Sequence, residues 1–141
     1  MIRRVIQIKN QFAELERARR EATRLLESEG LGPHSIRIVN LGLEEVITNI
    51  LKYGYDDDRE HSIQITFRLT AAELQMAVVD DGHEFDPLEH PEPAPNQPLE
   101  NREPGGLGIC FLRKFFDEVQ YRREAGKNSL TLRKRLPARN R

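Results

Sequence analysis

The sequence predicts an α+β domain, because two kinds of apolar pattern occupy separate segments of the chain. Apolar residues recur every three or four positions, as on one face of a helix, in the segments 12–30, 33–54 and 107–116. Apolar and polar residues alternate, as in half-buried strands, around 2–8, 63–69, 74–78, 119–121 and 130–132. The chain has 141 residues, 38% of them hydrophobic, which is enough for one core. We therefore expect a single domain spanning 1–141.

The N-terminal third is expected to form a strand followed by two helices. Three isoleucines share one face of the strand, and Asn10 is the candidate cap of the first helix. Apolar spacing predicts that this helix runs from Phe12 until Gly30 ends it. A second helix should begin at Pro33, because proline is favoured in the first turn, and end near Gly54.

The middle of the chain predicts a β-hairpin that ends in polar residues. The alternating segments 63–69 and 74–78 are separated by a short connection. Val78 is expected in the core, and side chains two positions apart on a strand point to the same side. Asp80 should therefore face the same side as the core.

A long loop separates the hairpin from the last helix. Residues 86–104 show no periodicity, and five of the chain's eight prolines lie in 87–98. Loops of this length are usually lids, binding segments or disordered segments. We expect a lid over about 87–104 that is disordered without a ligand. After the helix, Gly126-Lys127-Asn128 is expected to turn between the two final strands.

Bulk composition excludes several classes of partner. The chain has 22 basic and 23 acidic residues, so no net charge attracts it to nucleic acid or to a membrane surface. The basic segment 133–141 is expected to be a solvated strand end and tail. A single cysteine, Cys110, excludes an internal disulfide and should be a buried small apolar side chain. No signal peptide or membrane-length apolar run is found, so we expect a cytoplasmic protein.

Glu45 and Asn49 form the first of three polar blocks. Residues four apart on a helix stand on one face, and this face points away from the apolar stripe. Asparagine inside a helix costs roughly 0.5 kcal/mol relative to alanine, so its presence asks for a reason. Binding of Mg²⁺, which prefers oxygen ligands, is one such reason. Lys52, one turn later, can reach a phosphate as a point charge. The alternative is an ordinary solvated helix face.

Asp80 and Gly82 form the second block, at the end of an apolar strand. The aspartate can accept a hydrogen bond from the exocyclic amino group of a base, and the glycine lets the backbone approach a flat ring closely. A tight turn is the alternative, since aspartate and glycine are both common turn residues.

The third block opens the last helix, where free backbone amides and the helix dipole can attract a triphosphate. Arg102 is the nearest basic residue before it. The four histidines lack the spacing of a metal cage built from side chains. The third block consists of Gly105, Gly106, Leu107 and Gly108. Alone a glycine run is a weak signal, but the three blocks together indicate an ATP site.

In order and spacing, the blocks resemble the GHKL ATP-binding superfamily, and most closely its stand-alone anti-sigma factor serine kinases. Segment 45–55 is similar to the N box, 79–87 to the G1 box and 104–109 to the G2 box. Ser129 stands where the superfamily often has threonine. Two residues depart from the pattern: Tyr53 replaces a common histidine, and Glu84 replaces a glycine or proline of many members.

The resemblance implies a two-layer α/β sandwich of the GHKL (Bergerat) type, with helices on one face of a mixed sheet and an ATP lid. It implies that Asn49 binds Mg²⁺ and that Glu45 is the general base for a serine hydroxyl. The implied contacts to ATP are Asn49, Lys52, Asp80, Gly82, Arg102, Gly105, Gly106, Leu107, Gly108 and Ser129.

The implied activity is that of an anti-sigma factor with serine/threonine protein kinase activity in a partner-switching system. Such a protein phosphorylates an anti-anti-sigma factor with a STAS-type domain and captures a sigma factor. An arginine of the first helix, Arg19 or Arg20, is expected to contact partners. Which sigma factor is regulated, and whether a homodimer forms, stay open.

Two alternatives remain. The chain could be a non-catalytic module that sequesters a protein and uses ATP as a structural ligand. The ATPase half of a sensor histidine kinase is disfavoured, because only ten residues precede the first helix and no helix pair carries a phospho-acceptor histidine.

Overall fold

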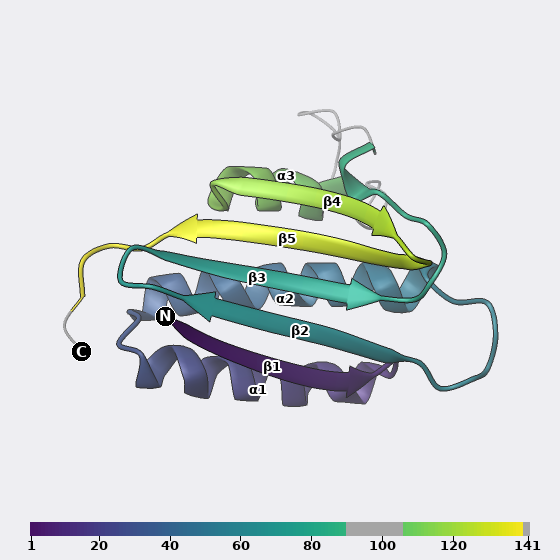
Figure 1. Cartoon of the computed structure of the whole chain (residues 1–141), viewed down its shortest axis with the longest axis horizontal. Helices are drawn as coiled ribbons and strands as arrows, with labels where there is room; N and C mark the ends of the chain where they lie inside the picture. The colour runs from purple at the N-terminus through teal and green to yellow at the C-terminus, as the bar shows by residue number, and fades with distance from the viewer. Residues whose placement is uncertain (90–105, 140–141) are drawn as a thin grey trace.

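The computed structural model describes residues 1–89 and 106–139, with the side chains of 106–109 left out. Within these ranges, three main helices lie on one face of a five-stranded sheet (Figure 1). No helix in these ranges is long and apolar enough to cross a lipid bilayer. The elements are β1 (Ile2–Lys9), α1 (Phe12–Ser28), α2 (Pro33–Tyr53), β2 (Ser62–Leu69), β3 (Glu73–Asp80), a short 3-10 helix η1 (Pro87–Glu89), α3 (Gly106–Phe115), β4 (Glu118–Glu124) and β5 (Lys127–Arg135).

The sheet has the strand order β1-β2-β3-β5-β4, and all four described pairings are antiparallel. The two-layer α+β fold is confirmed, but the expectation of a mixed sheet is wrong. Helices α1 and α2 lead the chain out and back, so β2 returns beside β1 in the opposite direction. The single helix α3 makes β4 run in the direction of β3, but β5 lies between them and is antiparallel to both.

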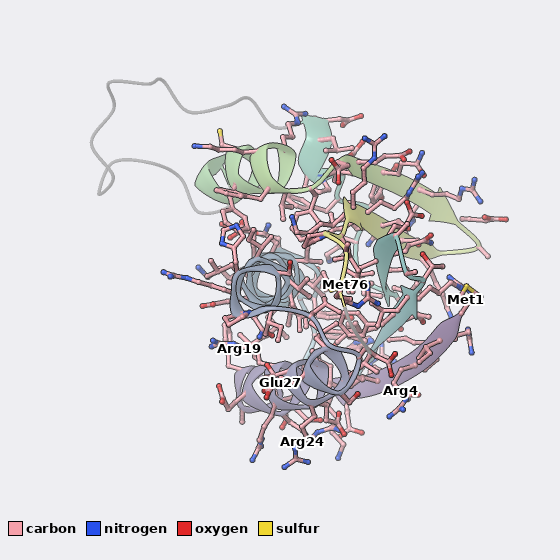
Figure 2. The ribbon with its side chains drawn as sticks, turned by 90° about the vertical axis from the view of Figure 1, so that its left-hand side faces the viewer. Met1, Arg4, Arg19, Arg24, Glu27 and Met76 are labelled. Carbon is pink, nitrogen blue, oxygen red and sulfur yellow. The ribbon has the colours of Figure 1, made fainter. Side chains whose placement is uncertain are left out.

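The core lies between the helical layer and the inner face of the sheet, where Figure 2 places Met76. Each fully buried large apolar side chain contributes roughly 1.5–3 kcal/mol relative to exposure. The expectation that Cys110 is buried is corrected, because it is half-buried. Phe12, the first residue of α1, is 58% exposed although it continues the apolar spacing of that helix. The largest fully buried side chains include Leu26, Leu43, Ile47, Ile65, Phe67, Met76, Leu112 and Leu132.

The start of α1 differs from the prediction that Asn10 caps it. Gln11 occupies the capping position without a side-chain bond. The Asn10 side chain instead accepts from the His61 amide at 2.8 Å. Glu14 stabilises the helix start instead. Its carboxylate accepts hydrogen bonds from the Lys9 amide at 3.0 Å and from the Arg17 guanidinium. These bonds, that of Arg17 foremost, lower the pKa of Glu14 to about 2.

The basic segment after β5 is tethered rather than freely solvated, which corrects the expectation for 133–141. The half-buried guanidinium of Arg139 donates to the carbonyl oxygens of Glu29, Ala71 and Thr70 at 2.8, 2.9 and 3.1 Å. This side chain joins the end of α1 to the β2–β3 hairpin.

Candidate functional site

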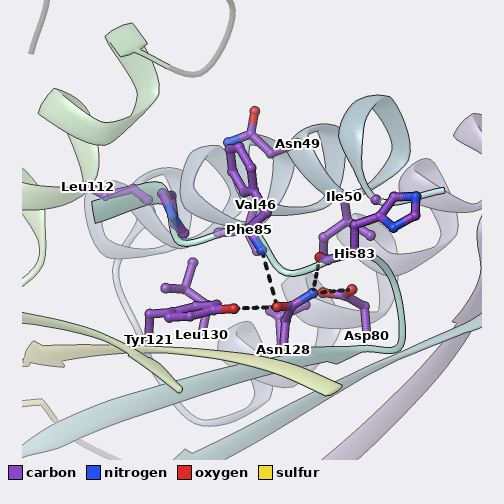
Figure 3. Close-up of a pocket in the computed structure, with 13 residues that line it drawn as sticks. Val46, Asn49, Ile50, Asp80, His83, Phe85, Leu112, Tyr121, Asn128 and Leu130 are labelled. Carbon is purple, nitrogen blue, oxygen red and sulfur yellow. Dashed lines mark hydrogen bonds between the residues drawn. The ribbon is translucent and has the colours of Figure 1, made fainter. Parts of the chain in front are cut away.

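A cavity opens between the C-terminal half of α2, the end of β3 and the strands β4 and β5 (Figure 3). Its walls are mostly apolar, and a few polar side chains converge on it. The interior volume is about 30 Å³, room for about one water molecule, so a larger ligand must displace side chains at its mouth. The apolar side chains are Val46, Ile50, Val78, Phe85, Pro87, Leu112 and Leu130, and the polar ones are Asn49, Asp80, His83, Tyr121 and Asn128, with Gly54 beside them.

Asp80 lies at the inner end of the cavity and is 5% exposed. The prediction that it faces the same side as Val78 is confirmed. Its Oδ1 accepts from the Gly82 amide at 2.8 Å and from Asn128 Nδ2 at 3.0 Å. Burial raises the pKa of this carboxyl, whereas the bonds from Asn128 and Gly82 favour its charged form. Asp80 is therefore a hydrogen-bond acceptor held in place by Asn128 and Gly82 in a mostly apolar cavity.

The turn after Asp80 packs directly against the end of α2. A Cβ atom on Gly82 would lie 2.5 Å from the carbonyl oxygen of Gly54, and the same oxygen accepts from the His83 amide at 2.8 Å. Only a residue without a side chain permits this approach. Gly82 thus joins the loop after α2 to the loop after β3.

Gly82→Ala is expected to lower the free energy of unfolding by about 1–3 kcal/mol, because the added methyl group must push the Gly54 carbonyl away. Chemical denaturation monitored by circular dichroism measures this change. Gly32→Ala is the control for the added methyl group, since a Cβ there meets no atom within 4 Å; because Gly32 is the N-cap of α2, where alanine is disfavoured, a loss of about 0.5–1 kcal/mol is expected. Equal stability of the two variants would contradict the packing argument.

Asn49 lines the cavity from α2 and is hydrogen-bonded to Glu45, one turn earlier. Asn49 Nδ2 donates to Glu45 Oε1 at 3.1 Å. Asn49 is buried and Glu45 half-buried, so the alternative of an ordinary solvated face does not hold for Asn49. Burial raises the pKa of Glu45, against the bond from Asn49 and the charge of Lys52. Lys52 itself is exposed.

Helix α3 is oriented with its N-terminus toward the cavity. A Cβ on Gly42 would touch the Phe116 ring at 2.8 Å, so the C-terminal end of α3 packs against the middle of α2. Leu112, one turn earlier, lines the cavity. Gly106, Leu107 and Gly108 open the helix on that side, while Arg102 and Gly105 lie outside the described residues, as does most of the expected lid.

The polar residue of β5 that lines the cavity is Asn128, not the expected Ser129. Asn128 pairs with Asp80 across the strands and lines the cavity, as Leu130 does, so Ser129 between them faces the other side of the sheet. The turn before β5 also differs from its predicted position: Ala125 and Gly126, both with positive φ, make a two-residue turn and β5 begins at Lys127.

Outside the cavity, a second polar cluster stabilises the turn that follows Asp80. His61 lies between two carboxylates, with Nε2 2.9 Å from Asp57 and Nδ1 3.2 Å from Asp81. Tyr55 donates to Asp81 at 3.2 Å and stacks on His61. Hydrogen bonds to Asp57 and Asp81 raise the pKa of His61. Asp81 therefore points away from the cavity, in contrast to its neighbour Asp80.

The two arginines expected to contact partners lie on α1, away from the residues that line the cavity. Arg19 is half-buried and 3.8 Å from Glu16, whereas Arg20 is exposed. Figure 2 shows Arg19 and Arg24 on the helical side of the molecule. The structure does not bring these arginines together with the three polar blocks.

The oxygen atoms that the cavity offers would hold one hard cation only if most of its ligands came from phosphates and water. In the part of the chain that is described, no group of three or more His, Cys, Asp or Glu side chains could hold a metal ion. The amide oxygen of Asn49 beside the Glu45 carboxylate is the kind of ligand that Mg²⁺ takes when phosphates and water complete its shell.

Comparison with known proteins agrees with this geometry. The profile of the histidine kinase-like ATPase domain matches residues 8–134. A relative in Bordetella bronchiseptica, serine/threonine-protein kinase BtrW, is 30% identical over 94 residues, which cover 67% of this chain and 66% of BtrW. Serine-protein kinase RsbW of Oceanobacillus iheyensis is 27% identical over 106 residues, covering 69% and 64%. RsbW of Bacillus subtilis is 24% identical over 95 residues, covering 64% and 59%.

A solved structure shares the fold. The crystal structure of the RsbU and RsbW domains of a Mycobacterium tuberculosis protein superposes with a TM-score of 0.66 at 17% identity, covering 99% of this chain and 34% of that one. The matched segments span about two thirds or less of the length of the relatives named above. Because the family profile extends over nearly the whole chain, the protein belongs to the histidine kinase-like ATPase domain family.

Proposed function

We propose that this chain binds ATP in the cavity and transfers the γ-phosphoryl group to a serine hydroxyl of a partner protein. One observation carries the proposal: a buried acceptor, Asp80, and an amide, Asn49, which is paired with the Glu45 carboxylate, line the same cavity from opposite layers. The relatives named as serine kinases support this reaction class.

The base of the nucleotide would lie at the β3–β5 end of the cavity. Asp80 would accept from the exocyclic amino group of adenine, while Val46, Ile50 and Leu130 supply apolar contacts to the ring. Because the interior is small, the base must displace side chains at the mouth, of which Phe85 belongs to the loop after β3. Side-chain movement of this kind is common on binding.

The phosphates would lie between the end of α2 and the start of α3. Asn49 would hold Mg²⁺, which neutralises charge on the phosphates when it is bound. The amides at the start of α3, from Gly106 to Gly108, provide donors at the positive end of the helix dipole. Lys52 adds an exposed positive charge one turn beyond Asn49.

Glu45 would act as the general base in the transfer. Its pKa is raised by burial, which brings the carboxylate closer to the range in which a base takes a proton efficiently near neutral pH. Asn49 orients this carboxylate through the 3.1 Å bond. The serine hydroxyl proton passes to Glu45 while the hydroxyl oxygen forms the new bond to the γ-phosphorus; the bond from this phosphorus to the bridging oxygen breaks, and ADP is the leaving group.

We infer that the physiological partners are an anti-anti-sigma factor with a STAS-type domain, as acceptor, and a sigma factor, as captured protein. Arg19 and Arg20 of α1 are the proposed contacts, on a surface separate from the cavity. The proposed site of action is the cytoplasm. The alternative, a module that captures a partner and uses ATP without transfer, predicts the same nucleotide binding but no phosphorylated product.

Asn49→Ala is expected to lower magnesium-dependent ATP affinity at least about tenfold, because the amide oxygen that would bind the metal is lost. Calorimetric titration of ATP with and without Mg²⁺ measures the effect. Asn40→Ala is the matched control: Asn40 lies in the same helix but bonds Thr23 rather than lining the cavity.

Transfer to a purified anti-anti-sigma candidate in the same samples then separates the kinase from the sequestering module. Wild-type protein that binds ATP and labels the partner on serine supports the kinase. Wild-type protein that binds neither ATP nor an ATP–Mg²⁺ mixture would overturn the proposed function.

A further inference from the structure

Asn128 is a buried polar residue of β5 that lines the cavity and has no part in the proposed reaction. It is 6% exposed, and its side chain makes four hydrogen bonds. Nδ2 donates to Asp80 Oδ1 at 3.0 Å and to the His83 carbonyl at 2.8 Å. Oδ1 accepts from the Tyr121 hydroxyl and from the Phe85 amide (Figure 3). These partners come from β3, β4 and the loop after β3.

The four bonds permit only one orientation of the Asn128 amide. If the amide group were flipped, its oxygen would face the Asp80 carboxylate and the His83 carbonyl. Three hydrogen-bond acceptors would then lie together with no donor between them. Both amide hydrogens and the amide oxygen are already used by protein groups. Asn128 is therefore suited to hold other groups in place rather than to bind a ligand directly.

The group that it holds is Asp80. Oδ1 of this carboxylate receives two donors, the Gly82 amide and Asn128 Nδ2. The carboxylate is thereby anchored through one oxygen, and the second oxygen, Oδ2, is the one left to present to the cavity. An ionised carboxylate only accepts hydrogen bonds, so it attracts an amino group and repels a carbonyl oxygen at the same position of a ring.

We propose that Asn128 is a positioning residue that keeps Asp80 anchored and ionised, and that it thereby determines the preference of the cavity for a 6-amino purine over a 6-oxo purine. The inference rests on the proposed function, because it assumes that a purine nucleotide occupies the cavity. It adds a specificity role for a residue whose amide groups are all bonded to other protein groups.

Charge balance around Asp80 supports this role. Burial raises the pKa of Asp80, and the bond from Asn128 is the first of the contacts that oppose the rise. The other charged or titratable groups near it are Asp81, which raises the pKa, Arg123, which lowers it, and Tyr55. Without the Asn128 donor, Asp80 would take up a proton at higher pH, and a protonated carboxyl group can donate to a 6-oxo purine.

Asn128→Leu tests the inference, because it removes all four bonds at similar volume. ATP and inosine triphosphate, each with Mg²⁺, are titrated into the wild type and the variant across a series of pH values. For the wild type we expect ATP to bind at least about tenfold more tightly than inosine triphosphate. For the variant we expect ATP affinity to fall about tenfold and the ratio between the two nucleotides to shrink to within about threefold.

The pH profile provides a readout that a purely structural role would not change. ATP affinity should fall as pH decreases through the pKa of Asp80, and in Asn128→Leu this fall should occur at higher pH than in the wild type. Asn128→Thr keeps one hydroxyl that can donate to Asp80, so its affinity ratio between the two nucleotides and its pH profile should lie between those of the wild type and Asn128→Leu. The threonine variant also tests the inference if the leucine variant does not fold. Ser129→Ala, on the opposite face of β5, should match the wild type.

Equal losses for both nucleotides with an unchanged pH profile would overturn the inference, and so would unchanged discrimination in Asn128→Leu. Those results, with a wild type that prefers ATP, leave the proposed ATP-binding function standing. A wild type that binds neither nucleotide overturns both the function and the inference.

Discussion

Asp80→Asn is expected to weaken ATP binding by about 100-fold or more. The Gly82 amide and Asn128 Nδ2 both donate to Oδ1, so the oxygen of an asparagine side chain would be drawn to these two donors. Its NH₂ group would then face the cavity, where the amino group of adenine also brings a donor. The loss of one charged hydrogen bond and the opposition of two donors together account for this magnitude. Calorimetric titration with ATP and Mg²⁺ measures it.

Asp81→Asn is the matched control for this substitution. The Asp81 carboxylate points away from the cavity to His61 and Tyr55, so ATP affinity should stay within about threefold of the wild type. The same titration of Asp80→Asn with inosine triphosphate adds a second arm, since the NH₂ group that this variant presents to the cavity would suit a 6-oxo purine. Equal ATP affinity in Asp80→Asn and the wild type would show that this carboxylate does not contact the base.

Glu45→Gln is expected to slow phosphoryl transfer by about 10²- to 10⁴-fold while ATP affinity changes by less than about threefold. Glutamine keeps the oxygen that accepts from Asn49 Nδ2, so the geometry of the pair is preserved. It cannot take up the proton of the serine hydroxyl, so only the chemical step is affected. Transfer of label from ATP to the partner under single-turnover conditions measures the rate, and calorimetry measures the affinity.

Glu44→Gln is the control for Glu45→Gln, because it changes the same kind of side chain one position earlier, whereas the bond from Asn49 goes to Glu45. Its transfer rate should match that of the wild type. A wild-type rate in Glu45→Gln, with normal ATP binding, would mean that the carboxylate is not the base. Slow transfer in both variants would instead point to a general effect of charge near the end of α2.

The elements with long, regular patterns could be predicted from the sequence. Helices α1 and α2 begin and end close to the expected residues, because their apolar spacing and their Gly and Pro boundaries are local signals. The β2–β3 hairpin follows from alternation, and the inward direction of Asp80 follows from strand parity alone.

Non-local arrangements could not be predicted in this way. The antiparallel sheet depends on β5 lying between β3 and β4, and no local pattern encodes that order. Local signals place Asn128 in a turn, because asparagine is a common turn residue, yet its partner Asp80 lies 48 positions earlier in the chain. The same kind of signal makes Asn10 the cap of the helix beside it, whereas its side chain bonds the backbone of His61.

The position of Asp80 and Asn128 on two neighbouring inner strands has a consequence for how the site opens. Amide groups of inner strands commonly exchange with solvent only when the whole domain unfolds, whereas groups on peripheral elements exchange through local opening. Asp80 lies on β3 and Asn128 on β5, both flanked by strands on each side, while α3 packs at one margin of the helical layer. The end of the cavity assigned to the base is thus built on two inner strands. Entry of the nucleotide would then require movement of side chains at the mouth, such as Phe85 in the loop after β3, while the backbone of the two inner strands stays in place.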